Sequence, residues 1–261
     1  MTLPSPSKEL GQHFLVDDNI LGVIGRLADL QSDDVVLEIG PGPGGLTAYL
    51  ADRVAKVHAV ELDRRLQPYL EARFEHSANV ELRFADAVSL DPAELDPPPR
   101  KLVSNLPYNV ATPIVVESLD RFPSIELWCV MVQREVADRF FAVPRTKDYG
   151  AVSVLVQLAA ERTGFHPVSR SVFRPPPNVD SALVAFRRRP SPPPIPWPEL
   201  KRVVEAAFAH RRKRLPNSLE LAALTDRKRA EDALETLGRR ADVRAEELEP
   251  EEFVRLATAL R

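Results

Sequence analysis

Cysteine and long apolar segments are scarce in this sequence, and each scarcity excludes a class of protein. The single cysteine, Cys129, rules out an internal disulfide and a zinc cluster built from cysteines, and its apolar surroundings favour an inert core thiol. Apolar runs such as residues 125–132 are too short to cross a bilayer. The N-terminus shows no positively charged segment followed by an apolar one. We therefore expect a soluble, cytoplasmic protein with no membrane partner.

An excess of positive charge is also absent. The formal net charge of -3 at pH 7 speaks against indiscriminate nucleic-acid binding through a uniformly basic surface. Two local basic clusters remain, at residues 187–189 and 210–214. Taken alone, each cluster is typical of a solvated helix or strand end.

The order of the apolar runs predicts an α/β fold. From residue 35 to residue 132, short apolar segments alternate with amphipathic ones, such as residues 46–53 and 64–74. This rhythm is typical of βαβ units, so we expect a Rossmann-like, mostly parallel sheet with helices on both faces. The valine-rich segments Ala151–Ala159 and 181–187 are expected to continue the sheet.

A proline-rich segment, PSPPPIPWP, interrupts this pattern at residues 190–198. Prolines at this density stop regular structure and give a stiff, extended connector. Leucines and alanines at helical spacing then follow in residues 199–209, 226–237 and 250–260. We predict a first domain at residues 1–189, a linker at 190–198 and a small all-helical domain at 199–261.

The segment LEIGPGPGGLT, residues 37–47, follows the first strand and opens a helix. Gly40, Gly42 and Gly44 allow a tight turn and the close approach of a ligand, and the helix start presents N–H groups to that ligand. Gly40, Gly42 and Gly45 also satisfy the dinucleotide pattern G-x-G-x-x-G. The loop alone therefore leaves both NAD and S-adenosyl-L-methionine open as cofactors.

Acidic residues and prolines near this loop favour the methyl donor. Glu61 ends the second strand, where a carboxylate can accept both ribose hydroxyls of an adenosine. Glu38 completes an E-x-G-x-G-x-G pattern typical of methyltransferases, and Asp86 follows the third strand, where it can accept the adenine amine. Pro41 and Pro43 remove N–H groups that would cradle a pyrophosphate. We predict an S-adenosyl-L-methionine site, and a nicotinamide-dependent dehydrogenase is the rival interpretation.

The motif NLPYN, residues 105–109, follows the next strand. By itself it is compatible with a simple turn. Beside a methyl donor, however, the Asn105 side-chain oxygen and the Leu106 carbonyl can accept the two hydrogens of an adenine amine, whose lone pair is otherwise delocalised into the ring. Pro107 would fix both acceptors, and Tyr108 offers a face on which an unpaired base can stack. Catalysis would then rest mainly on positioning.

Together these motifs make the chain resemble the small-subunit ribosomal RNA adenine dimethyltransferases of the KsgA or RsmA type over most of its length. KELGQHFLVDDNIL resembles the opening block, in which the residues at His13 and Leu15 line the cofactor, although many members have asparagine in place of His13. LEIGPGPGGLT, AVELD and FADA resemble the cofactor blocks, and NLPYN resembles the catalytic block, in which Asn105 also touches the cofactor. The resemblance implies a class I methyltransferase with a seven-stranded sheet.

Further blocks separate this family from other methyltransferases: MVQREVADRFFAVPRTKDYGAVSVLVQ, VFRPPPNVDSALV and AFAHRRKRLPNSL. By this resemblance, Phe173 is expected to be a second aromatic side chain that closes over the target adenine, with a core contact as the alternative. Basic residues are expected to contact rRNA, although Arg134 and Arg139 are equally compatible with ordinary helix-surface charge. The expected RNA contacts are Arg134, Arg139, Arg145, Lys147, Arg211, Arg212 and Lys213.

The reaction implied by the resemblance is transfer of two methyl groups to each of two adjacent adenosines. The target lies in the hairpin loop near the 3' end of 16S rRNA, within the small (30S) ribosomal subunit or its precursor. A monomer is expected. Two alternatives stay open: an enzyme of the macrolide-resistance type that methylates large-subunit rRNA, and a non-catalytic assembly factor on the same fold.

Overall fold

The computed structural model describes residues 3–7 and 10–261, and the chain forms two compact units. The first unit comprises the residues up to Ala137 together with Arg162–Arg188. The second comprises Asp138–Glu161 together with Arg189–Arg261. The chain therefore enters the second unit twice, and the expected domain limits at residues 189 and 199 stay predictions.

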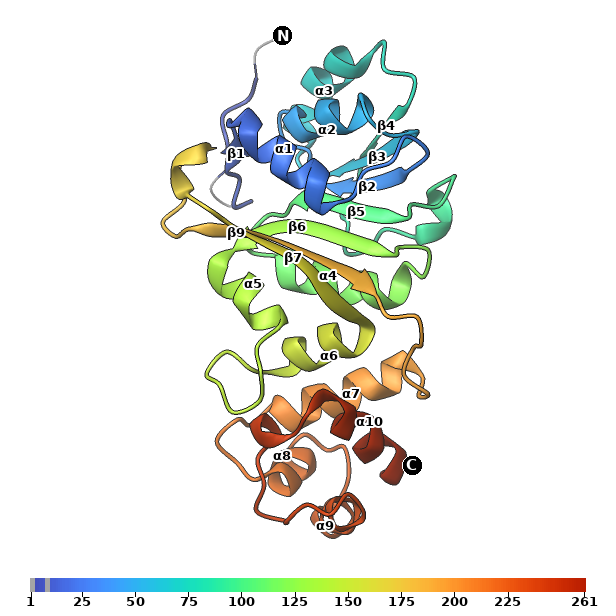
Figure 1. Ribbon diagram of the computed structural model, residues 1–261, viewed down its shortest axis with the longest axis vertical. Helices are drawn as coiled ribbons and strands as arrows, with labels where there is room; N and C mark the ends of the chain where they lie inside the picture. Colours follow the sequence, from blue (N-terminus) through green and yellow to red (C-terminus); the bar gives the residue numbers. More distant parts are fainter. Residues whose placement is uncertain (1–2, 8–9) are drawn as a thin grey trace. The chain divides into compact units, whose positions relative to one another are not determined.

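The first unit is built largely on a seven-stranded sheet. Its strands are β2 (Val35–Ile39), β3 (Lys56–Glu61), β4 (Val80–Phe84), β5 (Lys101–Asn105), β6 (Leu127–Gln133), β7 (Ala160–Val168) and β9 (Ser181–Arg188). Their order across the sheet is β4-β3-β2-β5-β6-β9-β7 (Figure 1). The strands from β4 to β6 are parallel, whereas β9 pairs antiparallel with β6. The predicted α/β class with a mostly parallel sheet is confirmed.

Helices cover both faces of this sheet, because its central strands are apolar on both sides. Figure 1 shows α1 (Asp18–Leu27), α2 (Gly45–Ala51) and α3 (Gln67–Phe74) on one face, and α4 (Ala111–Arg121) on the other. The core on the first face includes Ile24 of α1, Leu50 of α2 and Cys129 of β6. Burial raises the pKa of the Cys129 thiol to about 12, which keeps it protonated and inert.

The expectation that Ala151–Ala159 forms a strand is wrong, because this segment is the helix α6. Gly150 precedes the helix, and its N–H donates to the Ser153 side chain at 3.1 Å. Most of the α6 side chains are buried, so the segment is apolar nearly all round and lacks the polar stripe that marks a helix. Periodicity alone does not separate such a buried helix from a buried strand. The remaining strand of the sheet is β7, which begins directly after α6.

The second unit is helical. Besides α6 it contains α7 (Trp197–Phe208), α8 (Leu215–Leu221), α9 (Arg227–Thr236) and α10 (Pro250–Ala259). Its core holds an aromatic group in which the Phe208 ring stacks on Phe253, with centroids 5.6 Å apart, and meets the edge of Tyr149 at 5.9 Å. Tyr149 is fully buried, and its hydroxyl donates to the Leu248 carbonyl at 2.8 Å, so no polar group of this ring is left unpaired.

A small antiparallel ladder in the first unit joins segments far apart in the sequence. The strand β1 (Phe14–Leu15) pairs with β8 (Phe173–Arg174), so that Phe14 faces Arg174 and Leu15 faces Phe173. The ladder brings the N-terminal block beside the segment that carries the FRPPP sequence. Among the described residues, no helix combines the length and apolar character needed to cross a membrane.

Candidate active site

A pocket of about 200 Å³ lies at the carboxyl ends of β2, β3, β4 and β5. This is the edge at which open parallel sheets bind ligands, because strand-to-helix turns converge there. The pocket gathers nearly all of the residues predicted as catalytic or cofactor-binding. Those that line it are His13, Leu15, Glu38, Gly40, Gly42, Glu61, Asp86, Asn105, Leu106, Pro107 and Tyr108.

The glycine loop has the backbone conformation that the sequence predicts. Gly40 and Gly44 have φ angles of 73° and 78°, in the left-handed region that favours glycine. A Cβ on Gly44 would lie 2.7 Å from the Phe74 ring, and a Cβ on Gly40 would lie 3.3 Å from the Pro107 ring. Both glycines are therefore required for packing as well as for the turn, and Gly40 lets the catalytic block approach the loop.

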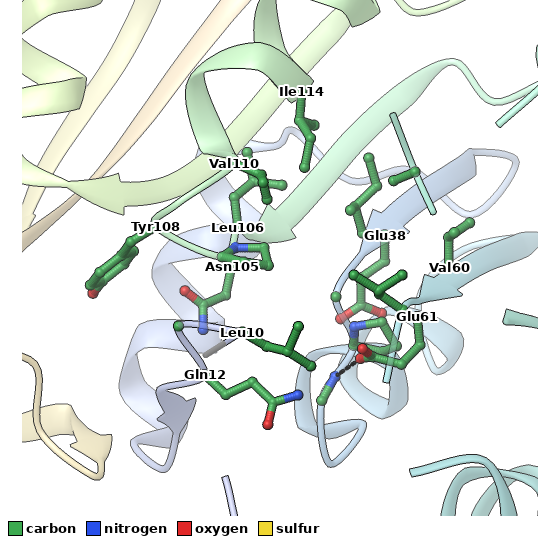
Figure 2. A pocket seen from close by; sticks show the side chains of 18 of the residues that line it. Leu10, Gln12, Glu38, Val60, Glu61, Asn105, Leu106, Tyr108, Val110 and Ile114 are labelled. Atoms are coloured by element: carbon green, nitrogen blue, oxygen red, sulfur yellow. Dashed lines mark hydrogen bonds between the residues drawn. The ribbon is translucent and has the colours of Figure 1, made fainter. Parts of the chain in front are cut away.

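Two carboxyl groups stand side by side next to this loop, Glu38 from β2 and Glu61 from the end of β3 (Figure 2). Glu61 accepts the N–H groups of Gly42 at 3.0 Å and Asp63 at 2.9 Å. Burial raises the pKa of Glu61, and these two hydrogen bonds oppose the shift. A carboxylate has about four acceptor sites, so Glu61 keeps capacity for ribose hydroxyls.

Glu38 is more isolated than Glu61. Its side chain is 1% exposed, and its Oε2 has no hydrogen-bond partner among the described residues. Burial raises the pKa of Glu38 to about 8; the neighbouring Thr47 hydroxyl opposes this shift, and the nearby Glu61 charge adds to it. A buried acid with one unpartnered oxygen at the wall of a pocket is suited to receive a cationic or hydrogen-bond-donating group from a ligand.

The orientation of the Asn105 amide follows from its contact with the N-terminal block. Its Nδ2 donates to the His13 carbonyl at 3.1 Å, and since a carbonyl can only accept, the Asn105 oxygen is the atom left for a ligand. The next residue, Leu106, donates its N–H to the Met131 carbonyl, whereas its own carbonyl accepts no hydrogen bond from any described residue. The pocket therefore contains the two free acceptors that the sequence predicts.

Tyr108 lies at the same side of the pocket as Asn105 (Figure 2). Its ring stacks on the His13 ring with centroids 5.3 Å apart, and its hydroxyl lies 2.5 Å from the Ser181 hydroxyl. The Nδ1 of His13 donates to the Pro175 carbonyl at 2.8 Å. His13 thus joins the N-terminal block, the catalytic block and the FRPPP segment, and it supplies the ring that stacks on Tyr108.

Phe173 is not part of the pocket wall. Its side chain is 0% exposed and belongs to the core cluster that also contains Ile24 and Leu50. The β1–β8 ladder explains this position, because alternate residues of a strand point to opposite sides and the next residue, Arg174, is exposed. In this structure Phe173 makes the core contact that was the alternative, and its expected contact with the adenine stays a prediction.

The cofactor side of the pocket includes apolar residues that motif matching missed. Leu62 and Val88 line the pocket and are 55% and 38% exposed, which is unusual for large apolar side chains at a polar edge. Leu62 directly follows Glu61, and Val88 follows Asp86 by two residues. Their places next to the two acids are the sequence signal that could have placed them in the pocket.

Comparisons with known proteins agree with this geometry. A family model described as ribosomal RNA adenine dimethylase matches residues 5–261. The chain belongs to the ribosomal RNA adenine dimethylase family. A relative named ribosomal RNA small subunit methyltransferase A, from Rubrobacter xylanophilus, is 49% identical over 253 residues, which cover 97% of this chain and 94% of the relative.

Solved structures support the same family assignment. A dimethyladenosine transferase from Plasmodium falciparum has a TM-score of 0.80 and 26% identity, and the match covers 94% of this chain and 96% of that one. The 23S rRNA methyltransferase ErmE has a TM-score of 0.66 and 32% identity, with 95% and 99% covered. Membership of the ribosomal RNA adenine dimethylase family confirms the predicted enzyme class and the S-adenosyl-L-methionine cofactor, with rRNA as the substrate.

For a dimethylase, the basic residues expected to meet rRNA divide into two kinds. Arg211 is held within the second unit, because it donates to the carbonyls of Lys147 at 3.0 Å and Tyr149 at 3.1 Å and lies 3.8 Å from Glu246. Arg212 and Lys213 are exposed, and their side chains have no hydrogen bond or ion pair with any described residue. Arg211 therefore contributes to packing, whereas its two neighbours present free charge, and the RNA contacts expected of all three stay predictions.

The other expected RNA contacts lie on both units. Arg134, on the first unit, stands over the Phe165 ring, with its guanidinium carbon 4.8 Å from the centroid. Arg145, on the second unit, lies 3.7 Å from Glu247, and its backbone N–H donates to the Glu246 carbonyl. Arg139 is half-buried and Lys147 is exposed. The RNA-binding roles of these residues stay predictions.

Proposed function

We propose that this chain transfers methyl groups from S-adenosyl-L-methionine to the N6 amines of two adjacent adenosines in the 3'-terminal hairpin loop of 16S rRNA, within the small (30S) ribosomal subunit or its precursor. The observation that carries the proposal is the free acceptor pair of Asn105 and Leu106 in the same pocket as Glu38, Glu61 and Asp86. The relative from Rubrobacter xylanophilus, named for the small ribosomal subunit, supports the choice of substrate.

The residues of the pocket fit this cofactor. The unpartnered Glu38 Oε2 suits the ammonium group of the methionine part, and Glu61 suits the ribose hydroxyls. Leu62 and Val88 offer apolar walls for the adenine ring, while Asp86 suits its amine. When bound, S-adenosyl-L-methionine supplies an electrophilic methyl group on a positively charged sulfur.

The acceptor pair prepares the adenine amine for attack. The Asn105 Oδ1 and the Leu106 carbonyl oxygen accept its two hydrogens, which favours a tetrahedral nitrogen whose lone pair points away from both acceptors. As positive charge develops on that nitrogen, both hydrogen bonds strengthen, so the pair stabilises the transition state more than the ground state. With S-adenosyl-L-methionine bound, this nitrogen would take the methyl group as the methyl–sulfur bond breaks, and one amine proton would then leave to water.

An unpaired adenine can enter this site at low cost, because a loop base has already lost its pairing partner. The Tyr108 ring provides the stacking surface at the acceptor end of the pocket. Arg212 and Lys213 supply charge for rRNA phosphates from the second unit. We propose that the enzyme acts as a monomer in the cytoplasm, where ribosomal subunits are assembled.

The direct test is nucleoside mass spectrometry after the purified protein and S-adenosyl-L-methionine are incubated with unmethylated small ribosomal subunits. Naked large-subunit rRNA serves as the parallel substrate. We expect dimethyladenosine in the small-subunit hairpin. Product in the large-subunit RNA alone would reassign the chain to an activity like that named for ErmE. Cofactor binding without product on either RNA would favour a non-catalytic assembly factor.

A further inference from the structure

The loop between β4 and β5 carries Asp86 and is shaped by hydrogen bonds from its own backbone. The Asp86 Oδ1 accepts the Val88 N–H at 2.9 Å, and the Asp86 carbonyl accepts the N–H of Ser89 at 3.1 Å and its hydroxyl at 3.2 Å. This is an Asx-type turn, in which the aspartate side chain replaces part of a backbone turn. The turn fixes one carboxylate oxygen of Asp86 and leaves the other for the pocket that Asp86 and Val88 line.

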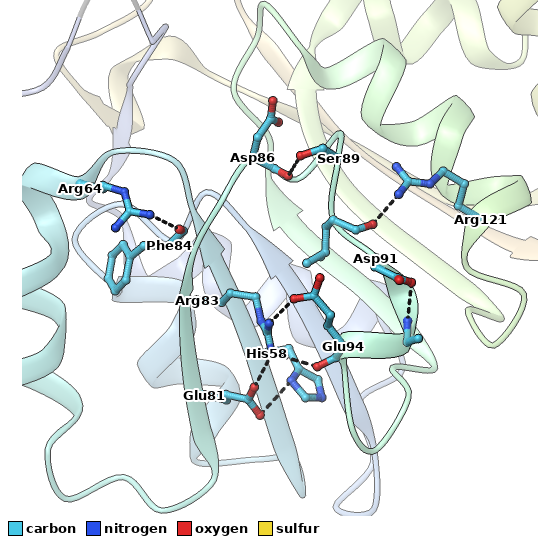
Figure 3. Close-up of polar contacts among 12 residues, drawn as sticks. His58, Arg64, Glu81, Arg83, Phe84, Asp86, Ser89, Asp91, Glu94 and Arg121 are labelled. Atoms are coloured by element: carbon cyan, nitrogen blue, oxygen red, sulfur yellow. Dashed lines mark hydrogen bonds and ion pairs between the residues drawn. The ribbon is translucent and has the colours of Figure 1, made fainter.

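Arg121 attaches this turn to the rest of the first unit. Its Nη1 donates to the Val88 carbonyl and its Nη2 donates to the Leu90 carbonyl. Figure 3 shows Arg121 reaching toward the loop that carries Asp86 and Ser89. Arg121 makes no ion pair with a carboxylate of any described residue, so its guanidinium serves only these loop carbonyls within the described chain.

The position of Arg121 in the fold gives this attachment a function. Arg121 is the last residue of α4, and α4 begins at Ala111, two residues after the end of the catalytic block. Ile114 of the same helix lines the pocket. One rigid helix therefore connects the end of the site that holds the acceptor pair to the loop that holds Asp86.

We propose that Arg121 is a positioning residue for recognition of the cofactor's adenine. By holding Val88 and Leu90 it maintains the turn that aims the free Asp86 oxygen at the exocyclic amine of the adenine ring. This inference rests on the proposed function, because it assumes an adenosyl cofactor in this pocket. On this inference, Arg121 helps the protein to distinguish a purine that carries an exocyclic amine from one that carries a carbonyl oxygen in the same place.

The test compares two analogues of the demethylated cofactor whose purine rings differ at this exocyclic group and in the proton on the adjacent ring nitrogen. S-adenosyl-L-homocysteine presents an amine to Asp86, whereas S-inosyl-L-homocysteine presents a carbonyl oxygen, which repels a carboxylate. We expect the wild-type protein to bind the adenosyl compound about 10- to 100-fold more tightly, measured by titration calorimetry. In Arg121→Gln the adenosyl affinity should fall about tenfold and the inosyl affinity should not fall, because the misaligned carboxylate neither accepts the amine nor repels the carbonyl oxygen.

Two further variants separate positioning from general stability. Arg100→Gln removes an exposed arginine at the far end of the same loop, next to β5, where it pairs with Glu126 at 3.0 Å, and it should leave the discrimination unchanged. Asp86→Asn alone should lower the ratio of adenosyl to inosyl affinity. The double variant Asp86→Asn with Arg121→Gln should lower this ratio no further, because Arg121 acts through the Asp86 carboxylate. Arg121→Lys, which keeps one donor, serves if the glutamine variant does not fold.

The outcomes are distinct for the inference and for the proposed function. Equal weakening of both analogues in Arg121→Gln would mean that Arg121 only stabilises the fold, and unchanged affinities for both analogues would mean that it does not position Asp86. Either result overturns the inference and leaves the methyltransferase proposal intact. Failure of the wild-type protein to bind either analogue would overturn the proposed function and this inference with it.

Discussion

Replacing Glu38 with glutamine should make the cofactor-free protein more stable at alkaline pH and change little at acidic pH. Burial raises the pKa of Glu38 to about 8, against an ordinary value of 4.5. Its Oε2 has no hydrogen-bond partner among the described residues, so the ionised form is poorly compensated in the folded state. Glutamine has nearly the same shape and is neutral at every pH.

The sign and size of the effect follow from proton linkage. Because the folded-state pKa lies above the unfolded value, native Glu38 keeps a proton that the unfolded chain releases, and the free energy of unfolding falls as the pH rises from about 4.5 to about 8. Between about pH 5.5 and about pH 8, ionisation of Glu38 in the unfolded chain lowers the free energy of unfolding by up to about 3 kcal/mol. The Glu38→Gln variant lacks this loss. At about 2–4 °C per kcal/mol, its Tm advantage should grow by roughly 6–12 °C over that range.

Scanning calorimetry at both pH values measures this change, and hydrogen exchange of peptides from β2 and β3 assigns it to the first unit. Glu94→Gln is the matched control, because Glu94 is an exposed acid that pairs with Arg83 on the same unit. Its Tm difference from wild type should vary far less with pH. If the Tm difference of Glu38→Gln were the same at both pH values, Glu38 would be ionised throughout in the folded protein, and the account of its isolation would be refuted.

The catalytic and RNA-binding assignments lead to three more expectations. Asn105→Ala should retain most RNA affinity but lose about 10²- to 10³-fold in methyl transfer, and single-turnover rates near wild type would contradict the acceptor pair. Tyr108→Phe keeps the stacking ring and should stay close to wild-type activity. Tyr108→Ala should weaken RNA binding by roughly 10- to 100-fold. Equal losses in the two variants would assign base binding to the hydroxyl instead of the ring. Charge reversal at Arg212 and Lys213 should lower the salt dependence of RNA binding and leave cofactor affinity unchanged. Arg211→Gln should chiefly lower the Tm. If Arg211→Gln instead changed the salt dependence and the charge reversal only lowered the Tm, the division of this cluster would be wrong.

Local sequence patterns were enough to predict the sheet, the glycine loop and most of the pocket. A parallel sheet places successive carboxyl ends at one edge, so Glu38, Glu61, Asp86 and Asn105 must converge once the strands are recognised. The same reasoning failed at Ala151–Ala159, where a helix with buried side chains nearly all round has no polar stripe to reveal its period.

The sequence by itself determined the kind of chemistry, since the types and spacing of the motif residues define what each strand end can bind. Tertiary structure alone decided which side chains support them. His13 meets Pro175 across 162 positions, Arg211 meets Lys147 across 64, and Arg121 holds a loop about 30 residues earlier in the chain. Such contacts depend on which strands pair and which helix ends face a loop, and no local period carries that information. Burial of Phe173 has the same origin, because the pairing of β1 with β8 turns it into the core.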